Sequence, residues 1–241
     1  MKHGFIDQYS DRDSFIHRLD PRTKFLTTLA FILAVTLTPS HHWQAFVICF
    51  AVVAALMALS KVPVLNILKR SLVIMPFVLL VTVFVPFFKE NGLVLLAAIL
   101  VKAWLSVLSL ILLTATTPVP RLLEGLERLR LPRVMVMVLS FMYRYIFVLV
   151  DEVMRMRQAR DSRSSGGSQL WQVKTIGRMA GTLFIRSYER GERVYAAMLA
   201  RGFDGQSRTL NNLSFKLADA YFTFVVVAVL LLISALSLWG G

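Results

Sequence analysis

Five long apolar stretches dominate this chain and restrict what it can fold into. They are Phe25–Thr38, Trp43–Leu59, Leu72–Phe88, Leu93–Thr117 and Ala218–Trp239. A helix needs about 20 apolar residues to cross the hydrocarbon core of a bilayer. With 56% hydrophobic residues and a mean hydropathy of +0.65, the chain is too apolar for a soluble domain of 241 residues. We therefore predict an all-α fold, a polytopic membrane helical bundle of about five transmembrane helices.

The distribution of basic residues predicts the orientation of this bundle. Of the 27 Lys and Arg residues, 17 lie in Pro118–Lys216, 5 in Met1–Lys24 and 3 in Lys61–Arg70. If the N-terminus is cytoplasmic, all three segments fall on the cytoplasmic side, as the positive-inside rule expects. We therefore expect a multi-pass membrane protein with a cytoplasmic N-terminus, in contact with the lipid bilayer.

The same pattern divides the chain into four parts. Residues 1–24 form a cytoplasmic N-terminal segment, and residues 25–117 contain four transmembrane helices. Residues 118–212 form a cytoplasmic region, and residues 213–241 contain the last transmembrane helix. Pro76 and Pro86 fall inside the third apolar stretch and predict a kinked or broken helix there, because proline removes a backbone donor.

The cytoplasmic region predicts one short and two long amphipathic helices. The short helix covers Arg121–Arg130, and the long ones cover about Pro132–Arg160 and Leu170–Arg201. Small residues let helices approach closely, so Gly177, Gly181 and Gly191 predict that the two long helices cross at short distance. In the second of these long helices, Leu170–Arg201, apolar residues recur with the helical period and form a stripe. Its members are Val173, Ile176, Ala180, Leu183, Phe184, Ser187, Gly191, Val194, Tyr195 and Met198.

Both long helices are predicted to end on a similar sequence. The first ends in Ala159-Arg160-Asp161 and the second in Ala200-Arg201-Gly202, where Gly202 suits the left-handed position after a helix end. An arginine in the last turn can simply complement the negative end of the helix dipole. It can also present several donors to acceptors on a partner protein. The residues alone leave both interpretations open.

Four segments of the chain resemble one known family. They are IHRLDPRTKFL (Ile16–Leu26), RLLEGLERLRLP (Arg121–Pro132), FMYRYIFVLVDEVMRMRQAR (Phe141–Arg160) and ERGERVYAAMLARGFDG (Glu189–Gly205). They resemble, in order, the transmembrane T component of energy-coupling factor (ECF) transporters, of the CbiQ/NikQ type found in cobalt and nickel importers. The resemblance implies a subunit that couples ATP hydrolysis to import of a divalent transition metal across a bacterial or archaeal cell (inner) membrane.

The resemblance also implies partners and contact residues. Two cytoplasmic ABC-type ATPase subunits would each receive one Ala-Arg-Gly-type helix end, so Ala200, Arg201 and Gly202 correspond to one contact. Ala159, Arg160 and Asp161 correspond to the other, with Asp161 in place of the glycine that is common in the family. A separate substrate-binding membrane subunit, the S component, would bind the metal. Apolar faces of the spans and of the two long helices would hold that subunit, including Leu183, Phe184 and Tyr195.

Other classes of function have weaker support in the sequence. No GxxxxGK[ST] run is present, so we expect no ATP hydrolysis, no catalytic residue and no cofactor in this chain. His41 and His42 are too few ligands to define a metal site. The alternatives are a T component for a vitamin-type substrate, a membrane-embedded lipid-modifying enzyme, and an autonomous carrier or channel, for which Lys102 is the one strong charge deep in a span. No recognition motif accompanies the basic charge, so we expect no nucleic-acid partner.

Overall fold

The structure is a computed structural model that describes residues 14, 16–17, 19–60, 62–88, 92–163, 169–205 and 217–239. Within these ranges the chain forms helices joined by turns, with no strand, which confirms the all-α prediction. It divides into two compact units, Met1–Leu129 with Asn211–Gly241 and Arg130–Leu210, and each is described by itself below.

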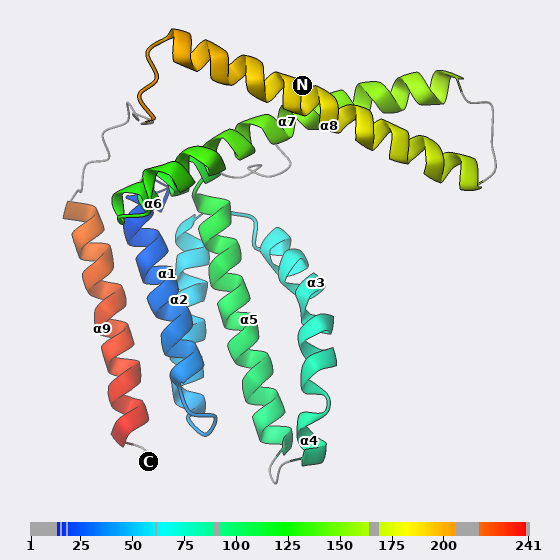
Figure 1. Cartoon of the computed structure of the whole chain (residues 1–241). Coiled ribbons are helices and arrows are strands. Elements are labelled where there is room, and N and C mark those ends of the chain that lie inside the picture. The colour runs from blue at the N-terminus through cyan, green and yellow to red at the C-terminus, as the bar shows by residue number, and fades with distance from the viewer. Residues whose placement is uncertain are drawn as a thin grey trace. The chain divides into compact units, whose positions relative to one another are not determined.

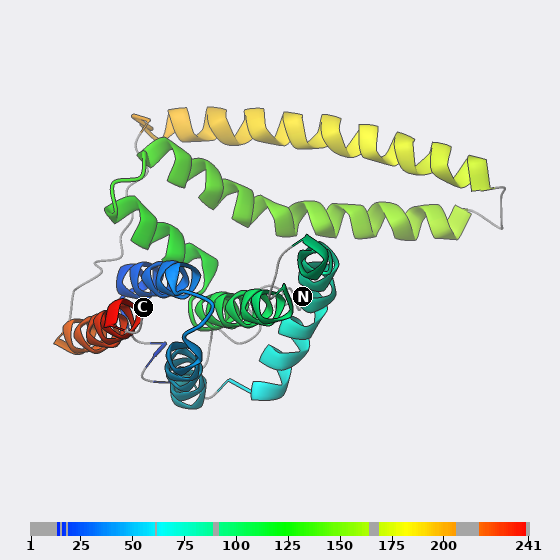
Figure 2. The same cartoon turned by 90° about the horizontal axis from the view of Figure 1, so that it is seen from below.

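The first unit is a helical bundle built around one central helix (Figure 1). Its helices are α1 (Pro21–Leu37), α2 (Trp43–Ser60), α3 (Val64–Thr82), α4 (Val85–Phe88), α5 (Gly92–Thr116), α6 (Val119–Arg128) and α9 (Leu217–Trp239). Helix α5 packs against α1, α2, α3 and α4, while α9 packs against α1 and α2 (Figure 2). The fully buried core includes Val35, Cys49, Leu105, Leu108 and Ile233.

The predicted spans are all present as helices, but they differ in how well they suit a membrane. By length and composition, α2, α3, α5 and also α7 (Arg133–Arg163) can cross a bilayer. Helix α1 has only 17 residues, which is short for a span. The first half of α7 is apolar enough to qualify, although it falls within residues 118–212, the predicted cytoplasmic region. That assignment stays a prediction.

The third span is broken, as its two prolines predicted. Pro76 is accommodated inside α3, and the chain leaves the helix at Val83 before α4 begins. The predicted start at Leu72 is wrong, because the helix begins at Val64, directly after Pro63. Its first turns carry Lys69 and Arg70 between the apolar residues, and these two charges separate them from the longer apolar run that begins at Leu72. At the following turn a Cβ on Gly92 would lie 2.3 Å from Pro86 Cα, which leaves room only for glycine.

Buried polar contacts join the start of α1 to the C-terminus of α5 and to the N-terminus of α9. The Asp20 amide donates to Asp219 Oδ1 at 2.7 Å, although the two residues are 199 positions apart in the chain. Asp20 also caps α1, since its Oδ1 accepts from the Arg22 amide at 3.0 Å. The Lys24 ammonium donates to Thr116 O at 3.2 Å and to Thr117 Oγ1 at 3.3 Å, at the C-terminus of α5. These contacts, which we call the polar junction, give the segment Ile16–Leu26 a structural role.

The second unit consists of two long helices that cross (Figure 1). Helix α7 has 31 residues and α8 (Gln169–Ala200) has 32. At about 1.5 Å per residue each is a rod of about 45–50 Å. The structure thus confirms that two long helices cross.

Candidate coupling site

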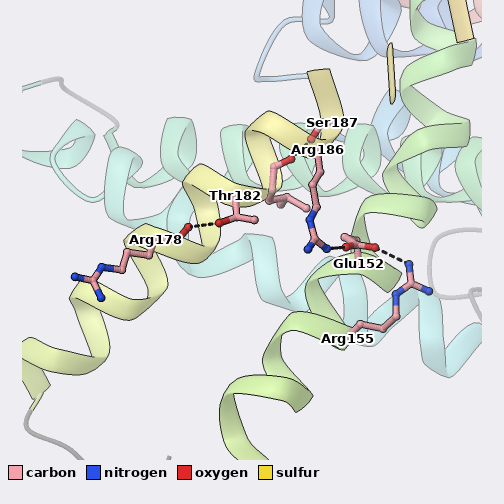
Figure 3. Close-up of polar contacts among 7 residues, drawn as sticks. Glu152, Arg155, Arg178, Thr182, Arg186 and Ser187 are labelled. Atoms are coloured by element: carbon pink, nitrogen blue, oxygen red, sulfur yellow. Dashed lines mark hydrogen bonds and ion pairs between the residues drawn. The ribbon is translucent and has the colours of Figure 1, made fainter. Parts of the chain in front are cut away.

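A carboxylate between two arginines marks the crossing of α7 and α8. Glu152 of α7 accepts from Arg155, one turn further along the same helix, at 2.7 Å. It also accepts from Arg186 of α8, so the contact ties the two helices together (Figure 3). The hydrogen bond from Arg155, with that from Arg186, holds the pKa of the Glu152 carboxyl below its ordinary value. The Glu152 side chain is only 12% exposed, whereas the side chains of Arg155 and Arg186 are 59% and 55% exposed.

One of these two partners is close to Glu152 in the sequence. Charge balance with Arg155 is the ordinary expectation for residues three positions apart on a helix. Arg186 is 34 positions from Glu152, and several other arginines on α8 were equally available in the sequence. Only the register of the crossing selects it.

The prediction that glycines line the crossing is wrong. A Cβ added at Gly177, Gly181 or Gly191 would meet no atom within 4 Å. The half-buried residues of α8 lie instead on a different face, and they are Thr175, Met179, Leu183, Ser187, Arg190, Val194 and Met198. Side chains of full size, together with the Arg186 contact, therefore set the separation of the helices.

The apolar stripe predicted on α8 is only partly covered. Leu183 belongs to the half-buried row, whose members Thr175 and Met179 line a cleft together with α7 residues. Phe184 is 73% exposed and Tyr195 is 58% exposed. Because the three glycines also face open space, one side of α8 presents a broad apolar surface with low relief. Contiguous exposed apolar surface of this kind is typical of a partner-binding face.

The C-terminus of α8 has the geometry that its sequence predicted. Gly202 takes a φ of 78°, which L side chains rarely adopt. Its amide donates to Leu199 O at 3.0 Å, and the Phe203 amide donates to Met198 O at 3.1 Å, the two hydrogen bonds of a Schellman motif. Arg201 is therefore held at the helix end, exposed, with no side-chain hydrogen bond recorded to the described part of the chain.

The end of α7 differs, and the prediction that both helices end alike is wrong. Helix α7 continues past Arg160 and Asp161 to Arg163. Asp161 Oδ1 accepts from Arg160 Nη2 at 2.7 Å and from Arg160 Nε at 3.0 Å, while Asp161 Oδ2 lies 3.8 Å from Arg157. An aspartate in place of glycine therefore extends the helix and holds the Arg160 guanidinium against its neighbour. The side chain of Arg160 stays 27% exposed, and Ala159 is exposed.

Comparisons with known proteins agree with this architecture. The family model CbiQ, described as cobalt transport protein, matches residues 12–211. An energy-coupling factor transporter transmembrane protein EcfT of Brevibacillus brevis is 31% identical to this chain and covers 95% of it and 96% of the relative. Another EcfT, from Clostridium kluyveri, is 29% identical and covers 98% of this chain and 97% of the relative.

A further relative carries additional sequence. A putative fused cobalt transport protein CbiMQ of Methanocorpusculum labreanum is 32% identical over 115 residues, which are 48% of this chain and 19% of the fusion. The family model spans most of the chain, and two relatives match it almost from end to end. The chain belongs to the CbiQ family of cobalt transport proteins and is a multi-pass transmembrane T component of an energy-coupling factor transporter.

Proposed function

We propose that this T component couples ATP hydrolysis by two cytoplasmic ATPase subunits to the import of a divalent transition metal ion. Cobalt is the first candidate because the family is named for cobalt transport, and nickel is the second. The protein itself would be non-catalytic, with its N-terminus in the cytoplasm, as the concentration of basic residues in the predicted inside segments supports.

The observation that carries this proposal is the pair of arginine-bearing helix ends in one unit. Ala200-Arg201-Gly202 forms a rigid end from which Arg201 projects without a recorded side-chain hydrogen bond among the described residues. Ala159-Arg160-Asp161 offers a second arginine, held in place by its aspartate. Each end would dock on one ATPase subunit. Two long helices tied by the Arg186–Glu152 contact can then transmit movement of the ATPases as a stiff pair.

The proposal is tested by removing the two arginines. If each guanidinium is buried in a groove of its ATPase, truncation costs about 2–5 kcal/mol of binding. We expect Arg160→Ala and Arg201→Ala to weaken co-purification of the ATPases, and the double variant to lose it together with metal uptake in cells. Arg193→Ala is the matched control, because Arg193 is 68% exposed on the same helix and makes only a 3.8 Å contact with Glu189. Normal uptake by the double variant at normal expression would refute the proposal.

The substrate-binding membrane subunit is proposed to dock on the exposed apolar face of α8. Phe184 and Tyr195 support this contact best, because both are exposed and lie beside glycines with open space around them. Leu183 would contribute only at the margin, since it is half-buried. The fused relative supports a lasting partner, because there a T-component sequence is joined to further sequence in one chain.

Charged substitutions on this face distinguish the two kinds of partner. Phe184→Glu and Tyr195→Glu should release the substrate-binding subunit because burying an unpaired carboxylate in an apolar contact is costly. The ATPase subunits should remain bound, since both helix ends are intact. Pull-down of the chain followed by identification of each retained subunit measures this. Retention of the substrate-binding subunit by both variants would exclude this face as its docking surface.

A further inference from the structure

A cleft of about 360 Å³ lies between the last turns of α7 and the first turns of α8. Its charged lining consists of Arg160 and Arg163 from α7 and Arg178 from α8. Between these guanidinium groups the wall is formed mainly by uncharged side chains, among them Trp171 and Met179. The cleft therefore combines three cationic forks with an apolar floor.

The positive charge of this cleft is only partly neutralised by nearby acidic residues, because Asp161 pairs with Arg160. Residues 152–186 contain seven basic and two acidic side chains. Both acids are engaged, Glu152 by Arg155 and Arg186 and Asp161 by Arg160 and Arg157. Residues 164–168, which join the two helices, contain no acidic residue. Within the described ranges Arg163 and Arg178 make no ion pair. Their charges favour binding of an anionic ligand from outside this unit.

The other helix end lacks this excess of charge. Residues 189–204, which contain Ala200-Arg201-Gly202, carry three basic and three acidic side chains. Arg193 lies 3.8 Å from Glu189 there. The two helix ends thus differ both in geometry and in charge, so their two partners must present different surfaces.

We propose that the cleft receives an acidic segment of the ATPase subunit that docks on the α7 end, and that Arg163 and Arg178 select it. This inference rests on the proposed function. Guanidinium groups bind carboxylates through paired, charge-assisted hydrogen bonds, and Arg163 and Arg178, one from each helix, can hold more than one acidic side chain. The apolar floor suits a protein segment, in which acidic residues are flanked by apolar ones.

Both helices of the unit line the cleft, and this affects how they couple to the ATPase. Because Arg178 comes from α8 and Arg163 from α7, a segment bound there contacts both helices at once. Docking on the α7 end would then depend on how α7 and α8 are placed relative to each other. The ATPase would hold the pair together at this end, in addition to the Arg186–Glu152 contact at the crossing.

Charge reversal in the cleft tests the inference. The full-length protein is placed in nanodiscs of neutral lipid, and binding of the ATPase subunits that co-purify with the wild type is measured at several salt concentrations. We expect Arg163→Glu and Arg178→Glu each to weaken binding about tenfold or more and to flatten its salt dependence. Arg163→Gln and Arg178→Gln introduce no new charge, so each should weaken binding less than the glutamate variant at the same position. Lys174→Glu is the matched control, since Lys174 is an exposed basic residue of α8 outside the cleft, and it should stay within about twofold of wild type.

The possible results separate this inference from the proposed function. If Arg160→Ala and Arg201→Ala weaken ATPase binding but the cleft variants bind as wild type, the inference is overturned and the proposed function stands. Equal losses in Lys174→Glu and the cleft variants would also overturn it, because general charge would then be responsible. If the cleft variants lose binding only in nanodiscs that contain anionic lipid, the cleft serves lipid headgroups and the inference is wrong. Failure of the wild type to retain any ATPase subunit would overturn both.

Discussion

Asp219 should stabilise the first unit through the polar junction, although it lies at the start of the last helix. Its Oδ1 accepts from the Asp20 amide at 2.7 Å, and Asp219 is only 1% exposed. In Asp219→Ala the Asp20 amide, in a residue that is 6% exposed, loses this acceptor. A hydrogen bond to a charged group contributes about 1.5–3 kcal/mol to stability. The Lys24 ammonium, which interacts electrostatically with both carboxylates, also loses one of them.

We therefore expect Asp219→Ala to lower the free energy of unfolding by about 2–3 kcal/mol. In a chain of this size 1 kcal/mol shifts the midpoint of thermal unfolding by about 2–4 °C, so the variant should melt about 4–12 °C lower. Asp219→Asn keeps an oxygen that can accept from the Asp20 amide and should lose about half as much. Thermal unfolding in detergent, followed by circular dichroism, measures all three proteins.

The matched control lies on the same helix. Leu217 is 91% exposed, so Leu217→Ala should change the free energy of unfolding by no more than about 0.5 kcal/mol. If Asp219→Ala melts with the wild type, the hydrogen bond contributes nothing and the reasoning is wrong. If Asp219→Asn is as unstable as Asp219→Ala, the charge near Lys24 matters rather than the acceptor.

Three further changes test other parts of the structure. Gly202→Val places a β-branched residue at a φ of 78° and should cost about 1–2 kcal/mol at the end of α8, whereas Gly202→Asn should be tolerated, and ATPase co-purification compares them. Gly92→Ala brings a Cβ to 2.3 Å from Pro86 Cα and should cost about 1–3 kcal/mol, read as a lower thermal midpoint. Because the pKa of Glu152 is lowered in the folded protein, its contacts with Arg155 and Arg186 stabilise the crossing above the ordinary pKa of a carboxyl and are lost as the pH falls through the lowered value. The hydrogen-exchange protection of amides at the crossing, taken relative to their intrinsic exchange rates, should accordingly fall in acid for the wild type and change little with pH in Glu152→Gln. An equal fall in both proteins would count against the contact.

Much of the fold could be predicted because hydrophobic patterning is local. The apolar stretches located five helices of the first unit, and Pro76 and Pro86 indicated the break that appears at Val83. The start of α3 was placed too late, because Lys69 and Arg70 interrupt the apolar sequence of its first turns. The amphipathic period likewise located α7 and α8 to within a few residues.

The sequence predicted those parts of the candidate site whose conformation depends on a single short segment. Gly202 indicated a left-handed helix end from its residue type alone, and the structure has it. At Asp161 the same reasoning failed, because an aspartate that binds Arg160 prolongs the helix to Arg163. The glycines of α8 suggested a close crossing, but small residues show only that a close approach is possible. Which face of a helix is covered depends on its neighbour.

The sequence by itself determined the helical class, the approximate limits of the long helices, the family and the left-handed end at Gly202. Each of these follows from the local order of apolar, basic, glycine and proline residues. Only the tertiary structure decided that Asp219 binds the Asp20 amide, that Arg186 rather than another arginine binds Glu152, and that Arg178 shares a cleft with Arg163. The two members of each pair are far apart in the chain, and other residues of the same type could have made the same contact. The register of the packed helices selects one of them.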